Sequence, residues 1–331
     1  MKNLNSTYYA KIMLFGEYSV IFDSMGLTIP YAHFQGKFRF MNSGTHDDYN
    51  FAIKSNRQLK SYADHLSTLL SKEHLSGILN LDELNKDISS GLYFDSSIPS
   101  GYGIGSSGAL VAAIFSSYGR FGSIEATAGP ERIKILKKVF SEMESFFFFF
   151  SSGIDPLLCY IKQPLLIRNK SDIQTVDIPR NKFSREGAIF LLDSGHPGET
   201  EPLVGHFIEK SKDPGFKEKI INDLIPLNDQ CISSLLMANT AEFSSSLKKL
   251  SEFQFNYFQP MIPKSMKKLW EEGLSHEKYS MKLCGSGGGG FMLAFADNYH
   301  AAVQELNKKS IDYITVYKNA INHKQLSFIF V

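Results

Sequence analysis

Residues 98–111, which read I-P-S-G-Y-G-I-G-S-S-G-A-L-V, constrain the fold more than any other part of this sequence. The stretch leads into an apolar run typical of a helix, and the residues that single it out are Pro99, Gly101, Gly103, Gly105, Ser106, Ser107 and Gly108. Glycine permits positive φ angles and lets a backbone approach a ligand closely. The first N–H groups of a helix lack internal partners, and the helix dipole makes that end positive. The stretch therefore predicts a cradle for an anion, such as the phosphates of a nucleotide.

Other interpretations of this stretch are weaker. A tight turn before a helix, capped by Ser106, uses the same residue types and stays open when the stretch is taken alone. A Walker A loop requires Gly-Lys-Ser or Gly-Lys-Thr, and the stretch contains no lysine. Residues 103–108 match the G-x-G-x-x-G spacing of dinucleotide-binding proteins, but that motif follows a buried strand. Polar, turn-like residues 95–99 come before it here, so we reject the dinucleotide interpretation.

The composition indicates a globular protein without a polyanionic partner. The chain has 331 residues, enough for two domains of ordinary size, and 43% of them are hydrophobic. Its formal net charge of +1 argues against nucleic acid or a charged membrane as partner. There is no apolar run long enough to span a membrane, and the N-terminal residues lack a signal-peptide core. The cysteines have no zinc-ligand spacing, so we expect a cytoplasmic protein; they are Cys159, Cys231 and Cys284.

Segments of strand and helix character indicate an α+β fold with two domains. We expect strands over residues 8–15, 19–22, 27–31, 37–41, 88–94, 165–168, 188–192, 282–284 and 291–295, with two more at the C-terminus. We expect one helix from the glycine-rich stretch to about residue 118 and three or four helices between residues 201 and 272. We also expect helices over residues 57–70, 130–145 and 300–308. A polar segment at 171–182 marks a boundary that divides the chain into residues 1–180 and 181–331.

Four separated segments occur in an order that points to one family. The first is A-K-I-M-L-F-G-E-Y-S-V at residues 10–20, and the second is the glycine-rich stretch. In the third, Glu144 comes eleven residues before Asp155, which lies in S-G-I-D-P. The fourth is K-L-C-G-S-G-G-G-G at residues 282–290. In this order they resemble the galactokinase, homoserine kinase, mevalonate kinase and phosphomevalonate kinase superfamily, the GHMP kinases.

Within this superfamily the chain is most similar to the mevalonate kinase branch. That branch has a lysine before an L-F-G-E turn, and a D-T-G…T stretch that L-D-S-G at residues 192–195 resembles, together with Thr200. The resemblance implies an N-terminal domain like domain 2 of ribosomal protein S5 and a ferredoxin-like C-terminal domain. It also implies ATP-dependent phosphorylation of a small-molecule hydroxyl, that of mevalonate, to give 5-phosphomevalonate in isoprenoid precursor synthesis.

The resemblance implies a role for each residue of this constellation, and the residue types suit phosphoryl transfer. Asp155 would accept the proton of the attacking hydroxyl, and Lys11 would stabilise the forming alkoxide. Ser107 and Glu144 would supply hard oxygen ligands to Mg²⁺. The phosphates of ATP would be held by Pro99, Gly101, Gly103, Gly105, Ser106, Ser107 and Gly108. The substrate-binding positions would be Glu17, Tyr18, Gly285, Gly287 and Gly288.

Each segment also has an ordinary structural explanation when it is taken alone. Lys11 suits a strand at the surface, and residues 287–290 suit a hairpin turn. Glu144 and Asp155 suit a solvated helix end and a helix cap. Only their joint order along the chain favours a kinase site over these explanations.

The sequence departs from the family pattern at two places. Tyr18 stands where mevalonate kinases usually have histidine, and tyrosine is also seen there in phosphomevalonate kinases. A run of five phenylalanines at residues 146–150 places Phe148 and Phe149 where the family usually has histidine and glycine. The run could pack into the core, crowd the acceptor pocket, or not belong to the natural sequence. These departures leave open a phosphomevalonate kinase, another GHMP kinase, or an inactive protein of this fold that binds a nucleotide or metabolite. The oligomeric state is also left open, with a homodimer as one alternative.

Overall fold

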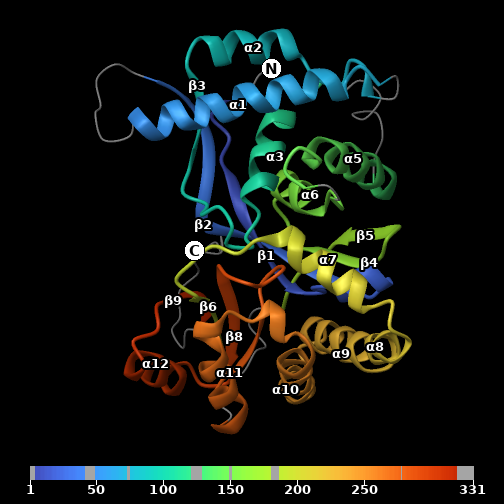
Figure 1. The fold of residues 1–331 in the computed structure, drawn as a ribbon, viewed down its shortest axis with the longest axis vertical. Helices are drawn as coiled ribbons and strands as arrows, with labels where there is room; N and C mark the ends of the chain where they lie inside the picture. The colour runs from blue at the N-terminus through green and yellow to red at the C-terminus, as the bar shows by residue number, and fades with distance from the viewer. Residues whose placement is uncertain are drawn as a thin grey trace. The chain divides into compact units, whose positions relative to one another are not determined.

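The computed structural model describes residues 4–41, 49–72, 75–120, 129–148, 151–179, 186–276 and 278–318. Its helices and strands (Figure 1) group into two compact units, each built from several segments of the chain. Unit 1 contains Met1–Lys11, Pro30–Ile98 and Gly105–Lys162, and unit 2 contains Ile12–Ile29, Pro99–Ile104 and Gln163–Val331. The predicted boundary between residues 180 and 181 lies outside the described residues, and it stays a prediction.

One long strand, β2, organises the first sheet. The strands of this sheet are β1 (Tyr8–Phe15), β2 (Gly26–Phe40), β3 (Leu92–Ser96), β4 (Leu165–Asn169) and β5 (Asp172–Thr175). Residues 36–40 of β2 pair antiparallel with β3 in unit 1, and residues 26–28 pair antiparallel with β4 in unit 2. The strands expected over 27–31 and 37–41 both lie in β2, apart from Met41, but they form one continuous strand instead of two. Because Gly36 has no side chain, the ring of Phe94 lies across the strand, where a Cβ would come within 2.3 Å of it.

Two other predicted strands differ from the structure. Residues 19–22 form a 3-10 helix, η1 (Ser19–Phe22), instead of a strand. Tyr18 and Asp23 flank it with φ angles of 64° and 68°, so the chain turns at both ends of this short element. The strand expected over 88–94 begins later, because helix α2 (Leu81–Ser89) covers the first residues of that range and β3 starts at Leu92.

Helix α3 is the central helix of unit 1. The other helices of this unit are α1 (Tyr49–Leu69), α2, α5 (Gly129–Glu144) and α6 (Ile154–Ile161). α3 (Ser106–Tyr118) packs against α5 and α6 (Figure 1), and its residues 108–115 are all buried. A helix that is small or apolar on every side belongs in a core, which explains why this segment is enclosed. The predicted helix from the glycine-rich stretch to Tyr118 is confirmed.

Unit 2 contains a second sheet, in which every pair of neighbouring strands is antiparallel and the order is β7-β8-β6-β9. Its strands are β6 (Ala188–Asp193), β7 (Ser280–Leu283), β8 (Phe291–Ala296) and β9 (Tyr313–Lys318). All six residues of β8 are buried, as expected for a central strand that is covered on both faces. The last glycine-rich segment connects the edge strand β7 to the central strand β8.

The described helices of unit 2 follow β6 in sequence, apart from the 3-10 helix η1. They are α7 (Thr200–Lys210), α8 (Pro214–Lys219), the π-helix η4 (Ile220–Leu224), α9 (Ile225–Leu236), α10 (Thr240–Tyr257), the 3-10 helix η5 (Gln259–Met261), α11 (Lys264–His276) and α12 (Tyr299–Lys308). α10 packs against β7, α9 and α11. The predicted α+β fold is confirmed. In the part of the chain that the structure describes, no helix has the length and apolar character needed to cross a membrane.

Candidate active site

The two glycine-rich loops meet within unit 2. Residues 99–104, which include Pro99 and Gly101, pack against residues 285–290, which we call the last glycine loop. Gly103 has a φ of 75°, and a Cβ on it would come within 2.5 Å of the Cys284 carbonyl oxygen. A side chain at this position would collide with backbone that cannot move aside. Glycine is therefore needed here to let two backbones touch.

The remaining predicted phosphate-binding residues lie at the start of α3 in unit 1. Gly105 precedes the helix with a φ of 79°, and a Cβ on it would come within 2.5 Å of the Lys11 side chain on β1. A Cβ on Gly108 would come within 2.9 Å of the Asp155 backbone. These two glycines thus bring the N-terminus of α3, with Ser106 and Ser107, close to Lys11 and to the N-terminus of α6.

Lys11 and Asp155 form an ion pair inside unit 1. The Lys11 ammonium lies 3.0 Å from Oδ2 of Asp155, and the two side chains are 7% and 34% exposed. Lys11 is therefore not a surface lysine, although its strand position alone allowed that explanation. The partial exposure of Asp155 leaves part of its carboxylate open to a ligand. Asp155 also lies in the first turn of α6, where the helix dipole stabilises a negative charge.

Gly153 explains why α6 starts where it does. It caps the helix with a φ of 71°, and a Cβ on it would come within 2.1 Å of the Lys137 carbonyl oxygen on α5. Only glycine can turn the chain this close to α5. The S-G-I-D segment therefore fixes the position of Asp155 through backbone packing.

Glu144, the last residue of α5, is buried at 3% exposure and bound by two hydroxyls of unit 1. Ser107 donates to its Oε1 at 2.9 Å, and Ser151 donates to its Oε2 at 2.5 Å. Burial, followed by the charge of Asp155, raises the pKa of Glu144 to about 7, against the opposing effects of both hydroxyls and of Lys11. Ser151 was missed by the sequence analysis, although it lies in the same short segment as Asp155.

The residues around Glu144 suit a magnesium ion. A buried carboxylate whose pKa is raised lacks compensating positive charge, and a cation would supply it. The oxygens of Ser107 and Glu144 are hard ligands, which Mg²⁺ prefers. Among the residues described, no cluster of three or more His, Cys, Asp or Glu could hold a metal. Mg²⁺ usually binds one or two protein ligands and completes its coordination shell with phosphates and water.

In unit 2, Glu17 is paired with a lysine that the sequence analysis did not select. Lys282 of β7 lies 2.5 Å from Oε1 of Glu17, and its side chain is 0% exposed. The only signal in the sequence is a lysine between two apolar residues of a strand. The second carboxylate oxygen of Glu17 is buried and has no hydrogen-bond partner among the described residues.

Tyr18 is also buried in unit 2, at 5% exposure. Its hydroxyl donates to the carbonyl oxygen of Ser286 at 2.6 Å, and its ring packs 4.7 Å from that of Phe207 and 5.4 Å from that of Phe258. Burial, with the nearby charge of Glu17, raises the pKa of Tyr18. The tyrosine thus reaches the last glycine loop directly.

The last glycine loop has a backbone that depends on glycine. The predicted substrate-binding residues Gly285, Gly287 and Gly288 have φ angles of 75°, 75° and 76°. The N–H of Gly288 donates to the Met261 carbonyl oxygen at 2.6 Å. The loop is therefore held in a defined shape by unit 2 itself.

The phenylalanine run begins as packing against α1. The rings of Phe146 and Phe147 lie 5.2 Å and 5.1 Å from the ring of Tyr62, and Phe146 also contacts His65 at 5.3 Å. Phe148 is half-buried. Phe149 and Phe150 lie outside the described residues. The start of the run therefore serves packing, and its effect on an acceptor pocket stays a prediction.

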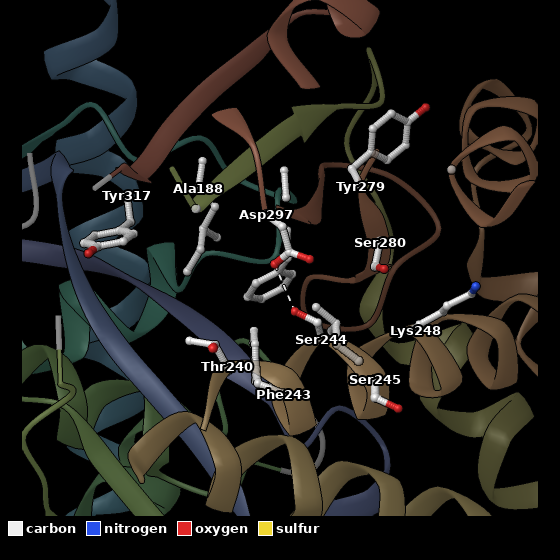
Figure 2. A pocket seen from close by; sticks show the side chains of 16 residues that line it. Ala188, Thr240, Phe243, Ser244, Ser245, Lys248, Tyr279, Ser280, Asp297 and Tyr317 are labelled. Carbon is white, nitrogen blue, oxygen red and sulfur yellow. Dashed lines mark hydrogen bonds between the residues drawn. The ribbon is translucent and has the colours of Figure 1, made fainter. Parts of the chain in front are cut away.

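A separate cavity of about 270 Å³ lies in unit 2 (Figure 2). It is lined by residues of α10 and of the strands β6, β8 and β9, and Ser244 donates to Asp297 at its centre at 2.9 Å. Asp297 directly follows β8, whereas the last glycine loop precedes that strand. None of the predicted site residues lines this cavity.

No protein-family model and no curated protein sequence matches this chain. Solved structures match it over nearly its whole length. L. major mevalonate kinase in complex with R-mevalonate is 17% identical, with a TM-score of 0.61, and the match covers 97% of this chain and 100% of that one. Streptococcus pneumoniae phosphomevalonate kinase in complex with phosphomevalonate and AMPPNP is 12% identical, with a TM-score of 0.56 and coverages of 94% and 99%. Lactococcus lactis galactokinase complexed with galactose is 12% identical, with a TM-score of 0.57 and coverages of 95% and 94%.

Proposed function

We propose that this chain, whose fold is that of the GHMP kinases, is an ATP-dependent kinase that phosphorylates a small-molecule hydroxyl. One observation carries the proposal: within unit 1, the Lys11–Asp155 ion pair lies beside the N-terminus of the helix that follows the glycine-rich stretch. A base, a cation and an anion-binding helix end are the parts that phosphoryl transfer needs. The fold by itself does not imply activity, and the proposal therefore depends on these residues.

Asp155 is proposed to act as the base. Its carboxylate accepts the proton of the acceptor hydroxyl as that oxygen forms a bond to the γ-phosphorus of ATP. The bond between the γ-phosphorus and the bridging oxygen then breaks, and ADP leaves. Lys11 pairs with Asp155 and stabilises the negative charge that develops on the attacking oxygen.

The phosphates of ATP are proposed to bind the backbone of residues 103–108 and the first turn of α3. Ser107 and Glu144 would hold a magnesium ion, which neutralises charge on the phosphates when it is bound. The hydroxyl of Ser151 orients Glu144 from its other side, and its hydrogen bond partly opposes the rise in the pKa of this carboxyl group.

Mevalonate is the acceptor we propose, with 5-phosphomevalonate as product. The lysine before L-F-G-E, the S-G-I-D segment and L-D-S-G with Thr200 support this choice over galactose and homoserine. The L. major structure is a mevalonate complex, which shows that this fold accommodates that acceptor in that protein. Tyr18 favours the second candidate, a phosphomevalonate kinase, because tyrosine also stands at this place in that branch.

A coupled assay of ADP release tests the proposal. The purified chain would be given ATP and Mg²⁺ with mevalonate, phosphomevalonate, homoserine or galactose, and Asp155→Asn would be the matched inactive control. We expect release with mevalonate above the rate with no acceptor, and none from the control. Release with phosphomevalonate alone would select the second candidate. ATP binding without release on any acceptor would indicate an inactive nucleotide-binding protein.

A further inference from the structure

The turn after β1 is attached to the last glycine loop at two points, both inside unit 2. Glu17 binds Lys282 at 2.5 Å, and Lys282 lies on β7 just before the loop. Tyr18 donates its hydroxyl to the carbonyl oxygen of Ser286, the second residue of the loop, at 2.6 Å. Two consecutive side chains thus bind the chain on either side of the loop's first glycine.

Lys282 is bound on several sides, although it is completely buried. Besides Glu17, its ammonium donates to the carbonyl oxygen of Leu283 at 2.6 Å and lies 5.5 Å from the centre of the Phe15 ring. The N–H of Leu283 in turn donates to the side chain of Gln254 at 2.9 Å. The end of β7 is therefore held by polar contacts at a buried position, where apolar side chains are more common.

A buried ion pair contributes little to stability compared with apolar side chains of similar size, because desolvation offsets the attraction. Such a pair does impose geometry, since the two charged groups must meet at one distance and angle. Lys282 and Glu17 are 0% and 4% exposed, so both charges lie away from water. The geometry they impose is that of the last glycine loop relative to the turn after β1, both within unit 2.

We propose that Glu17, Tyr18 and Lys282 are positioning residues that hold the last glycine loop in the shape required for phosphate binding. That phosphate binding requires this loop shape rests on the proposed kinase function. Residues 99–104 pack on this loop through the contact of Gly103 with Cys284 and lead directly into α3. Glu17 and Tyr18 therefore act through the loop in this proposal, and the direct substrate contact that the resemblance implied stays a prediction.

The decisive variant replaces both charges. Glu17→Met with Lys282→Met keeps side-chain length and fills the same space, and it avoids the unpaired buried carboxylate that Lys282→Met alone would leave. Tyr18→Phe removes only the hydroxyl and retains the ring contacts. Lys278→Met is the matched control, because Lys278 pairs with Glu305 at 2.7 Å in the same unit and close to β7 but does not touch the loop.

Hydrogen exchange of the loop amides measures the shape without requiring turnover. The N–H groups of Gly288 and Gly290 donate to the carbonyl oxygens of Met261 and His196, each at 2.6 Å. We expect both amides to exchange at least about 10-fold faster in the double variant, with a melting temperature close to that of the wild type. Tyr18→Phe should accelerate the Gly288 amide, and the control should leave both rates within about 3-fold of the wild type.

If the folded double variant has the same Gly288 and Gly290 exchange rates as the wild type, the proposal is overturned, because the ion pair would then not influence the shape of the loop. If the double variant does not fold, Tyr18→Phe decides: an unchanged Gly288 rate overturns the proposal and a faster rate supports it. Turnover separates this result from the proposed function. If the wild type phosphorylates no acceptor while the loop amides respond as expected, the kinase proposal fails and the positioning role stands. In an active enzyme, we expect kcat/KM for ATP to fall about 10-fold in the double variant but not in Lys278→Met.

Discussion

The ammonium of Lys11 and the carboxylate of Asp155 lie 3.0 Å apart, on the first strand of the sheet and in the first turn of α6. The contact depends on two glycines, Gly105 beside Lys11 and Gly108 beside Asp155, which allow the N-terminus of α3 to approach both residues. A base and a cation thus lie next to a helix end that can bind an anion, which is why the first prediction concerns Asp155.

Asp155→Asn is expected to lower kcat by about 10²–10⁴-fold, because the amide cannot accept the proton of the hydroxyl. ATP should still bind, since its phosphates are proposed to contact backbone. Steady-state kinetics and calorimetry measure the two effects. Asp172→Asn is the control, because Asp172 forms an exposed pair with Arg168. Near-normal turnover of Asp155→Asn would remove Asp155 from the mechanism.

Ser107→Ala and Glu144→Gln are each expected to raise the magnesium concentration needed for half-maximal activity, because each removes a hard oxygen ligand. Ser151→Ala is a matched control, since Ser151 also binds Glu144 but is not a proposed ligand. Its magnesium requirement should shift less. Magnesium titrations of activity provide the measurement, and unchanged curves for both ligand variants would place the metal elsewhere.

Gly153→Ala is expected to destabilise the protein by about 2 kcal/mol or more, because the residue has a positive φ and its Cβ would overlap the Lys137 carbonyl oxygen. Gly205→Ala is the control. Gly205 lies inside α7 with nothing within 4 Å of the added Cβ, so this change should stabilise the protein by about 0.5–1 kcal/mol. Thermal unfolding compares the two, and equal melting temperatures would contradict the prediction.

Phe148→His combined with Phe149→Gly is expected to raise turnover at least ~10-fold, which corresponds to about 1.4 kcal/mol of transition-state stabilisation. The reason is that the family residues would relieve crowding between Glu144 and Asp155. ATP affinity should stay the same. Phe146→Leu is the control, because its ring packs against Tyr62 and should affect stability more than turnover. Wild-type turnover of about 1 s⁻¹ or more would show that the run does not obstruct the acceptor.

Local patterns in the sequence predicted the elements that depend mainly on neighbouring residues. The strand over residues 8–15 and the helix ending at Tyr118 match the structure at the bounds that were predicted for them. The helix predicted over 130–145 differs from α5 by one residue at each end. In each case a regular apolar pattern coincides with a strong start or stop signal, and both lie within a few residues of chain.

Long-range packing decided what the local patterns could not. The strand expected at residues 19–22 is a 3-10 helix, and the two expected short strands are one strand, on which Phe94 packs across Gly36. The structure of these segments depends on residues far away along the chain, so it cannot be predicted from a short stretch of sequence.

The sequence by itself determined which chemical groups the candidate site contains: Lys11, Ser107, Glu144, Asp155 and two glycine-rich loops, since residue type and spacing are properties of the chain. Only the tertiary structure decided which of these groups meet. It brought Ser151 to Glu144 and Lys282 to Glu17, and it buried Glu17 and Tyr18 against the last glycine loop. The physical reason is that a contact between distant residues depends on how whole elements pack, and that packing is set by the core of each unit.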